Sequence, residues 1–308
     1  MQSLSLNYDN FLANAKHNCL LENHDYHYIW LWGGRGSAKT SDAVRLLTID
    51  CLTQSYMRCI VIIKDAVKLS DSIYQQFKDF IINNGLAQWF DFKDSRYRIE
   101  CVNGNIFTFR NGKDASNAKG LANYNFALFE EVDQIAKDDY DFIVGTIRNV
   151  SGSKVRIYHT FNPESGKFSY KEHWIYKNHF DVSREIYCTF EKSMQSEVRG
   201  KLETLNYIFI HSTCDDNPYC PPANIVLYDS FKDTNTAKYR IWRLGRWSNK
   251  DTENLFAYNF DIDKHVGKVK FIPDLPLHIV FDQNYKPYST CTISVSYTHL
   301  TLPTICSV

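Results

Sequence analysis

A run of residues near the N-terminus has the types and the spacing needed to hold phosphate groups. It reads Gly33-Gly34-Arg35-Gly36-Ser37-Ala38-Lys39-Thr40 and approaches the pattern G-x-x-x-x-G-K-[ST]. Glycines let bare backbone N–H groups curl around phosphates, and a helix that starts there adds a favourable dipole. Lys39 would contact the β- and γ-phosphates, and the Thr40 hydroxyl would ligate Mg²⁺. The run therefore predicts a nucleotide site with ATP and Mg²⁺ as its cofactors.

Ala38 stands where the pattern has its last glycine. We expect this position to open the helix, where alanine is the best helix former, so the methyl group is the only extra demand. The alternative is a glycine-rich turn with a chance lysine. The apolar run 28–32 before the loop and the helical pattern that starts at Ser37 favour the nucleotide site over that alternative.

An acidic pair follows a second apolar run. Residues 125–133 read NFALFEEVD, which predicts a buried strand that ends at Glu130 and Glu131. At the carboxyl end of a parallel strand, both side chains would reach a nucleotide crevice. We assign Glu130 to Mg²⁺, through water, and Glu131 to activation of the attacking water. The alternative is a solvated acidic helix start, because acidic residues are favoured in the first turn of a helix.

A third segment, YHTFNP at 158–163, predicts a strand that ends in Thr160-x-Asn162-Pro. A simple strand-ending turn is its alternative, because Asn-Pro is a common turn dipeptide. The phosphate loop with its arginine, the acidic strand end and this segment, in that order, resemble the large subunits of tailed-phage terminases. Weaker similarities are KGL at 119–121, TIR at 146–148, DNP at 216–218 and WRLGRW at 242–247.

The resemblance, which runs from about Tyr28 through Asn284, implies an ATP-hydrolysing motor that moves viral double-stranded DNA into procapsids. It implies a ring of copies docked on a portal protein, a small terminase subunit as a further partner and no membrane contact. The place of action would be the cytoplasm of the infected bacterial host. Asp is common among relatives at the position of Glu130, so the Glu130-Glu131 pair is a variant.

The resemblance also implies roles for single residues. Thr160 and Asn162 would sense the γ-phosphate and couple hydrolysis to movement. Motors of this kind stabilise the transition state with an arginine supplied in cis or in trans. Arg35 in the loop and Arg148 are both candidates, and the sequence does not choose between them.

Two other function classes stay open. Another P-loop DNA motor, such as a helicase-like or mobilisation ATPase, would share the loop and the acidic strand but would not need Thr-Phe-Asn-Pro. A nucleotide-binding assembly module that does not hydrolyse ATP would have no use for Glu131. An assay of turnover separates the module that does not hydrolyse ATP from the motors.

The composition is that of an ordinary globular protein. Of 308 residues, 44% are hydrophobic and 23% are charged, and no apolar run approaches the roughly 20 residues that cross a bilayer. Basic and acidic residues number 35 each, so the formal net charge is zero. A contact with DNA would therefore need a local basic patch or a ring.

Nine cysteines occur without a C-x-x-C pair, which favours reduced thiols. His211, Cys214 and Cys220 lie close enough in sequence to suggest zinc, but no fourth ligand falls at a finger-like spacing. We therefore interpret them as buried groups near the end of a strand.

The elements that must position these residues alternate between strands and helices. Strands are expected at 28–32, 58–64, 97–110 with a hairpin turn at Asn103-Gly104, 126–129 and 155–160. Helices are expected from Ser37, from Ser70 as an N-cap, and around 224–231 and 237–247. This alternation predicts an α/β fold with a mainly parallel sheet, as in a P-loop NTPase, and the resemblance adds a small lid region.

Trp242 and Trp247, together with Arg240, Arg243 and Arg246, predict a basic and aromatic helix. We interpret it as a lid helix whose tryptophans face the lid core and whose arginines face solvent. Contact of the arginines with DNA phosphates is the alternative.

Residues 279–284, IVFDQN, resemble the first metal-binding strand of the ribonuclease-H-like nuclease in the same family, with Asp282 as the ligand. We expect an ATPase domain with its lid at 1–250, a linker at 251–276 and the start of a nuclease at 277–308. Cleavage by two metals needs several carboxylates, and no acidic residue follows Asp282. The nuclease is therefore expected to be cut short and inactive in this chain, and residues 294–308 resemble adaptor-derived sequence.

Overall fold

The computed structural model describes residues 11–22, 25–64, 69–112, 123–148, 152–165, 169–180, 187–249, 277–282 and 290–295. By its internal contacts the chain divides into two compact units, Met1–Lys250 and Asp251–Val308. The described part of the first unit holds the large sheet with its helices. The described part of the second unit is one hairpin.

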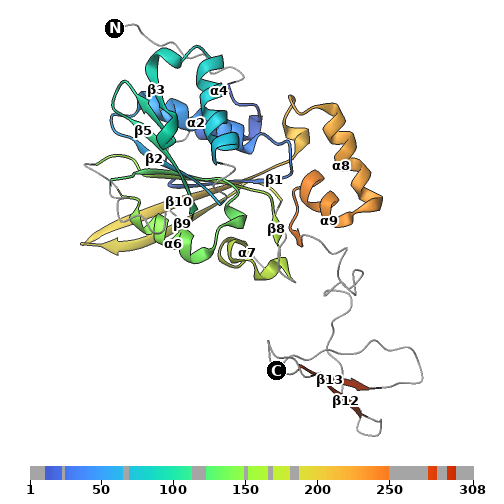
Figure 1. The fold of residues 1–308 in the computed structure, drawn as a ribbon. Helices are drawn as coiled ribbons and strands as arrows, with labels where there is room; N and C mark the ends of the chain where they lie inside the picture. Colours follow the sequence, from blue (N-terminus) through green and yellow to red (C-terminus); the bar gives the residue numbers. More distant parts are fainter. Residues whose placement is uncertain are drawn as a thin grey trace. The chain divides into compact units, whose positions relative to one another are not determined.

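A nine-stranded sheet in the order β3-β4-β5-β2-β6-β7-β1-β10-β9 forms the centre of the first unit (Figure 1). The strands are β1 (Tyr28–Gly33), β2 (Arg58–Ile63), β3 (Phe90–Lys93), β4 (Arg98–Cys101), β5 (Ile106–Asn111), β6 (Phe126–Phe129), β7 (Arg156–Phe161), β9 (Phe190–Val198) and β10 (Lys201–Ser212). From β5 to β10 neighbouring strands run parallel, and antiparallel strands extend both edges. The predicted α/β fold with a mainly parallel sheet is confirmed.

Continuous apolar runs became the central strands because both faces of these strands are covered. Every residue of β6 is buried, and β1 is buried from Ile29 to Gly33. Aromatic side chains fill one side of this core, where the rings of Trp30 and His159 stack with centroids 3.7 Å apart. The strands expected from these runs, and the hairpin at Asn103-Gly104, are all present.

Helices lie on both faces of the sheet (Figure 1). On one face are α2 (Lys39–Thr53) and α4 (Gln75–Asn83), and on the other are α6 (Lys137–Thr146) and α7 (Trp174–His179). Short helical elements connect them: η1 (Ala15–His17), α1 (Cys19–Glu22), η3 (Ala87–Trp89), η4 (Asp94–Arg96), η5 (Val132–Gln134), η6 (Tyr170–Glu172) and η7 (Cys214–Asp216). Ala43 and Leu47 of α2 are buried in the core.

The prediction that Ser70 caps a helix is wrong. A π-helical segment, η2 (Leu69–Tyr74), leads into α4, so Ser70 lies inside the helical run. Ile73 and Tyr74 of this segment are buried in the core.

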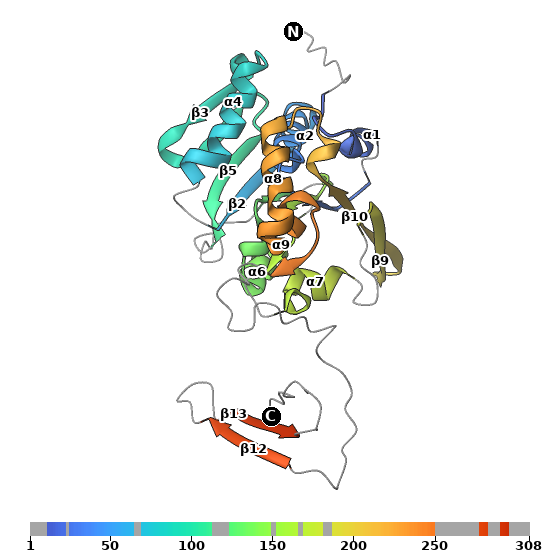
Figure 2. The ribbon, with the colours of Figure 1, turned by 90° about the vertical axis from the view of Figure 1, so that its right-hand side faces the viewer.

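A small helical region, called the lid below, consists of α8 (Pro222–Thr234), α9 (Thr236–Lys238) and η8 (Tyr239–Arg243). Figure 2 shows α8 and α9 in orange in front of the sheet. The helix expected through Trp247 ends at Arg243, because Gly245 takes a positive φ of 61° and turns the chain. Trp247 therefore packs in the sheet core beside Phe161 and Phe180 rather than in the lid.

Arg243 was expected to face solvent, but its guanidinium lies 2.6 Å from Asp215 and 2.8 Å from Asp229. Two ion pairs tie the end of η8 to η7 and α8. The basic character of this helix is thus partly neutralised by carboxylates of the same region.

Two small sheets complete the described structure. Strands β8 (Glu164–Ser165) and β11 (Ser248–Asn249) pair in parallel, and β12 (Leu277–Asp282) pairs antiparallel with β13 (Thr290–Val295). The strand expected from IVFDQN is present as far as Asp282. The nuclease assignment of Asp282 stays a prediction, and residues 119–121, 251–276 and 296–308 lie outside the described part. No described helix is long and apolar enough to span a membrane.

Candidate active site

The carboxyl ends of β1, β6 and β7 meet at one edge of the sheet because the three strands are parallel and two pairs of them are direct neighbours. Ligands bind at such an edge in open α/β sheets. A pocket of about 450 Å³ lies there. The predicted residues on its wall are Arg35, Gly36, Ser37, Ala38, Lys39, Thr40, Glu130, Glu131, Thr160 and Asn162.

Gly33 and Gly34 lie behind this wall rather than on it. A Cβ added at Gly33 would lie 1.9 Å from the Ser212 carbonyl oxygen, and one at Gly34 would lie 2.6 Å from the Trp242 carbonyl oxygen. The Gly34 N–H donates to Ser212 over 2.8 Å. These glycines are therefore needed for close packing of the loop against β10 and the lid.

Gly36 does line the pocket, with a positive φ of 74°. A Cβ at this position would also lie 2.7 Å from the Cys220 Sγ atom. Both the backbone conformation and the space thus demand glycine here.

The interpretation of Ala38 as the first residue of the helix is wrong. Ala38 is the N-cap of α2 and has a left-handed conformation, with φ 65° and ψ 16°. The high helix propensity of alanine therefore brings no benefit. A left-handed residue with a Cβ costs about 1–2 kcal/mol, which a glycine would avoid.

Lys39 is 8% exposed, and its ammonium group is held entirely by polar atoms of the site. It donates to the Gly34 carbonyl over 2.6 Å, to the Ser37 hydroxyl over 3.1 Å and to the Asn162 Oδ1 atom over 3.0 Å. Burial lowers the pKa of Lys39 to about 8, although the nearby Glu130 carboxylate opposes the shift. The phosphate loop and the end of β7 are linked through this one cation.

Glu130 also links the phosphate loop, at Thr40, to the end of β7, at Thr160. Its carboxylate accepts a hydrogen bond of 2.7 Å from the Thr40 hydroxyl and another from the Thr160 hydroxyl. Burial raises the pKa of Glu130 to about 7, against the effect of these two hydroxyl donors. Carboxylate and hydroxyl oxygens are hard ligands, so Thr40 and Glu130 fit the predicted Mg²⁺ site.

Glu131 lies on the pocket wall in a left-handed conformation with a φ of 50°. The Gln134 side chain donates to its Oε2 atom over 3.0 Å and fixes the orientation of the carboxylate. Backbone strain of this kind is concentrated at functional sites, where the surrounding structure enforces it. The geometry agrees with a carboxylate that is held in one orientation rather than freely solvated.

The two candidate arginines are in different places. Arg35 lines the pocket, and its guanidinium carbon lies 3.9 Å from the centre of the Trp242 ring. Arg148 does not line the pocket, and its N–H donates to the Tyr124 carbonyl before the start of β6. Only Arg35 is therefore placed to act in cis, and a role for Arg148 in trans stays a prediction.

Several residues of the site carried no recognised signal in the sequence. Gln76 from α4 and Tyr228 from α8 contribute to the pocket wall. Asn217, noted only as part of a DNP similarity, donates to the Gly36 carbonyl over 2.7 Å. Buried Asp42 accepts from the N–H groups of Ala13 and Asn14 and so ties the N-terminal segment to α2.

The suspected zinc group has another role. The His211 Nε2 atom lies 3.0 Å from the Gly245 carbonyl oxygen, and burial lowers the pKa of His211 to about 4. Cys214 and Cys220 are buried in the lid core with Tyr228. Among the described residues, no cluster of histidine, cysteine or acidic side chains could hold a metal ion by itself.

A phosphate loop between a buried strand and a helix, with an acidic strand end and a polar strand end beside it, defines a P-loop NTPase of the α/β class. The family model of the phage terminase large subunit matches residues 25–246. The chain belongs to that family.

One curated relative is the PBSX phage terminase large subunit of Bacillus subtilis (strain 168), which is 24% identical over 221 residues. The matched part covers 71% of this chain and 49% of the relative, so the chain spans about half the length of the curated relative it matches.

Two solved structures show the same fold. The ATPase domain of the large terminase from Thermus phage P74-26 matches with a TM-score of 0.52 and 13% identity, covering 80% of this chain and 100% of that domain. The large terminase of a thermophilic bacteriophage in complex with ATP-γ-S matches with a TM-score of 0.56 and 17% identity, covering 92% of this chain and 65% of that chain.

Proposed function

We propose that this chain is the ATP-hydrolysing motor subunit of a phage DNA-packaging machine and moves viral double-stranded DNA into procapsids. The observation that carries the proposal is the meeting of Lys39, Thr40, Glu130, Glu131 and Asn162 at one pocket in a fold of the terminase family. The ATP-γ-S complex of a structural relative supports ATP as the ligand. The partners would be a portal protein, a small terminase subunit and further copies of the chain in a ring, in the host cytoplasm.

Phosphate binding would begin by exchange at Lys39. Its ammonium group, now satisfied by the Gly34 carbonyl and Asn162, would turn to the β- and γ-phosphates. Bound Mg²⁺, held by Thr40 and Glu130, would neutralise phosphate charge. Glu131 would accept the proton of the water that attacks the γ-phosphorus, while the bond to the β-phosphate oxygen breaks.

Coupling to movement would run through the end of β7. When the Lys39 ammonium group turns to the γ-phosphate, it no longer donates the hydrogen bond of 3.0 Å to the Asn162 Oδ1 atom. Thr160, two residues earlier, is hydrogen-bonded to Glu130, which directly follows the neighbouring strand β6. Loss of the γ-phosphate would thus restore the contact of Lys39 with Asn162 at the end of β7, and a moving segment attached to β7 could follow this change.

A DNA-packaging assay tests the proposal. Purified chain, procapsids with portal, linear duplex DNA and ATP are mixed, and DNA protected from added nuclease is measured. Protection that needs ATP and disappears in Lys39→Ala supports the motor. Strand separation without protection would favour a helicase-like motor, and procapsid binding without ATP turnover would favour an assembly module. Either result would contradict the proposal.

A further inference from the structure

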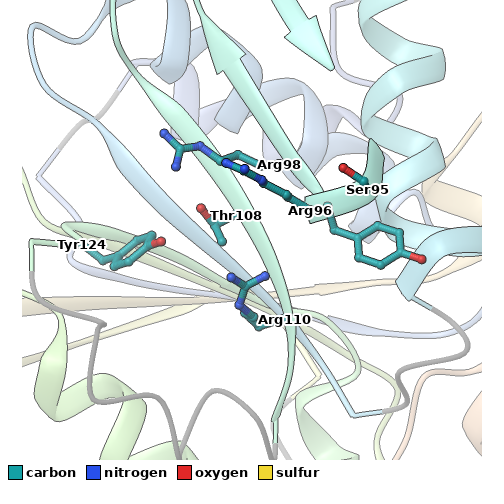
Figure 3. Close-up of a pocket in the computed structure, with 7 residues that line it drawn as sticks. Ser95, Arg96, Arg98, Thr108, Arg110 and Tyr124 are labelled. Carbon is teal, nitrogen blue, oxygen red and sulfur yellow. The ribbon is translucent and has the colours of Figure 1, made fainter. Parts of the chain in front are cut away.

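A second pocket, of about 320 Å³, lies on β4 and β5 and shares no lining residue with the nucleotide pocket. Three arginines, Arg96, Arg98 and Arg110, contribute to its wall (Figure 3). Hydroxyl groups of Ser95, Thr108 and Tyr124 contribute as well. We call it the arginine pocket.

Strand register builds this pocket. Arg98 on β4 is the cross-strand partner of Thr108 on β5, and Arg110 lies two residues further along β5. Side chains two apart in a strand share a face, so these three lie on one face of the sheet. The neighbouring cross-strand pair, Ile99 and Phe107, is fully buried in the core on the other face.

The pocket carries excess positive charge. No carboxylate is among its lining residues. Glu100, next along the same face of β4, lies 2.8 Å from Arg98, and the side chains of this pair are 36% and 37% exposed. Three arginines against one carboxylate leave an excess of two positive charges, which favours an anionic ligand.

Thr108 gives the pocket an unsatisfied polar group. Its side chain is 6% exposed, and its hydroxyl has no hydrogen-bond partner among the described residues. Figure 3 shows Arg98 and Arg110 on opposite sides of Thr108, with the Tyr124 hydroxyl directed toward the same space. An anionic oxygen in this space would pair with the hydroxyl and with the guanidinium groups together.

We propose that the arginine pocket binds backbone phosphates of duplex DNA. Arginine presents a planar set of donors that matches phosphate oxygens, and Ser, Thr and Tyr hydroxyls are frequent donors to phosphates of nucleic acids. The chain has a formal net charge of zero, so DNA affinity requires a local basic surface such as this one. The identity of the polymer rests on the proposed function, whereas the phosphate chemistry rests on the pocket.

The test is equilibrium binding of a short fluorescent duplex to the full chain without nucleotide, across a salt series. The pocket variant carries Arg96→Gln, Arg98→Gln and Arg110→Gln. A matched control with the same change of net charge carries Arg199→Gln, Lys201→Gln and Lys232→Gln, whose side chains are exposed on other elements. The pocket variant should bind duplex roughly 10-fold or more weakly, with a salt slope smaller by about 2–3, because each lost phosphate contact removes about 0.9.

Equal losses in the two variants would show a general charge effect and overturn the proposal. An unchanged duplex affinity of the pocket variant would also overturn the proposal. This holds if that variant has instead lost binding of inorganic pyrophosphate, or has lost self-association. Binding of ATP-γ-S is measured in every variant. If the unmodified chain fails to bind ATP-γ-S, the proposed function fails, while the duplex titration still decides the pocket.

Discussion

The low pKa of Lys39 predicts that nucleotide binding weakens in mildly alkaline solution. Burial places this pKa at about 8 in the free protein. The triphosphate surrounds the ammonium with negative charge, which raises the pKa in the complex, so the bound state keeps its proton. The dissociation constant for ATP-γ-S should then rise with pH as the free protein loses the proton that binding requires.

The size of this effect follows from the pKa. Relative to its value with a fully protonated Lys39, the dissociation constant is about 1.3 times larger at pH 7.5 and about 33 times larger at pH 9.5. The ratio of about 25 between the two pH values corresponds to about 1.9 kcal/mol of binding free energy. Phosphate groups, with a second pKa near 6, stay ionised across this window. Binding should also take up about one proton per site near pH 9.5 and about a quarter of a proton near pH 7.5.

Isothermal titration calorimetry in buffers of different ionisation enthalpy measures both quantities. Lys39→Arg is the control, because guanidinium does not titrate in this range, and its affinity should not vary with pH. A dissociation constant that is constant over the window, with no proton uptake, would show that Lys39 stays fully charged in the free protein and that burial does not lower its pKa.

Three further outcomes are expected. The part of ATP affinity that depends on Mg²⁺ should increase as pH rises through about 7, because the raised pKa leaves Glu130 protonated below that value. Glu130→Gln should remove this pH dependence, and titration calorimetry with and without Mg²⁺ measures it. In urea denaturation, Ala38→Gly should raise the free energy of unfolding by up to about 1 kcal/mol and Gly36→Ala should lower it by about 2 kcal/mol, because both positions are left-handed; the opposite signs would contradict the loop geometry. Asp42→Ala should lower it by about 3 kcal/mol, because buried donors lose their acceptor; a loss as small as that of Asp79→Ala, on the exposed side of α4, would contradict the role given to Asp42.

The sequence predicted the strands and the three segments of the site because these features are local. A continuous apolar run, a glycine-rich loop and a carboxylate pair are each visible within about ten residues. Parallel packing then brings strand ends together without further information. Lys39, Glu130 and Asn162 each belong to one of these segments, and the structure brings them together at one pocket.

The remaining features depend on contacts between distant segments. The left-handed Ala38 is enforced by the loop around it, and alanine itself gives no sign of that conformation. Trp247 packs outside the lid because the chain turns at Gly245 and because a large aromatic core on the α7 side of the sheet holds the ring. The arginine pocket depends on the register between β4 and β5. The Asn103-Gly104 turn indicates a hairpin there, but it does not determine which residues pair across it.

The central claim, that this pocket hydrolyses ATP with Glu131 as the base, is tested most directly by one paired measurement. Steady-state phosphate release and ATP-γ-S affinity are determined for the unmodified chain, for Glu131→Gln and for the exposed control Glu197→Gln. If Glu131 is the base, Glu131→Gln retains the affinity but loses turnover by about 10²-fold or more, and the control matches the unmodified chain. Unchanged phosphate release in Glu131→Gln would show that Glu131 is not the base.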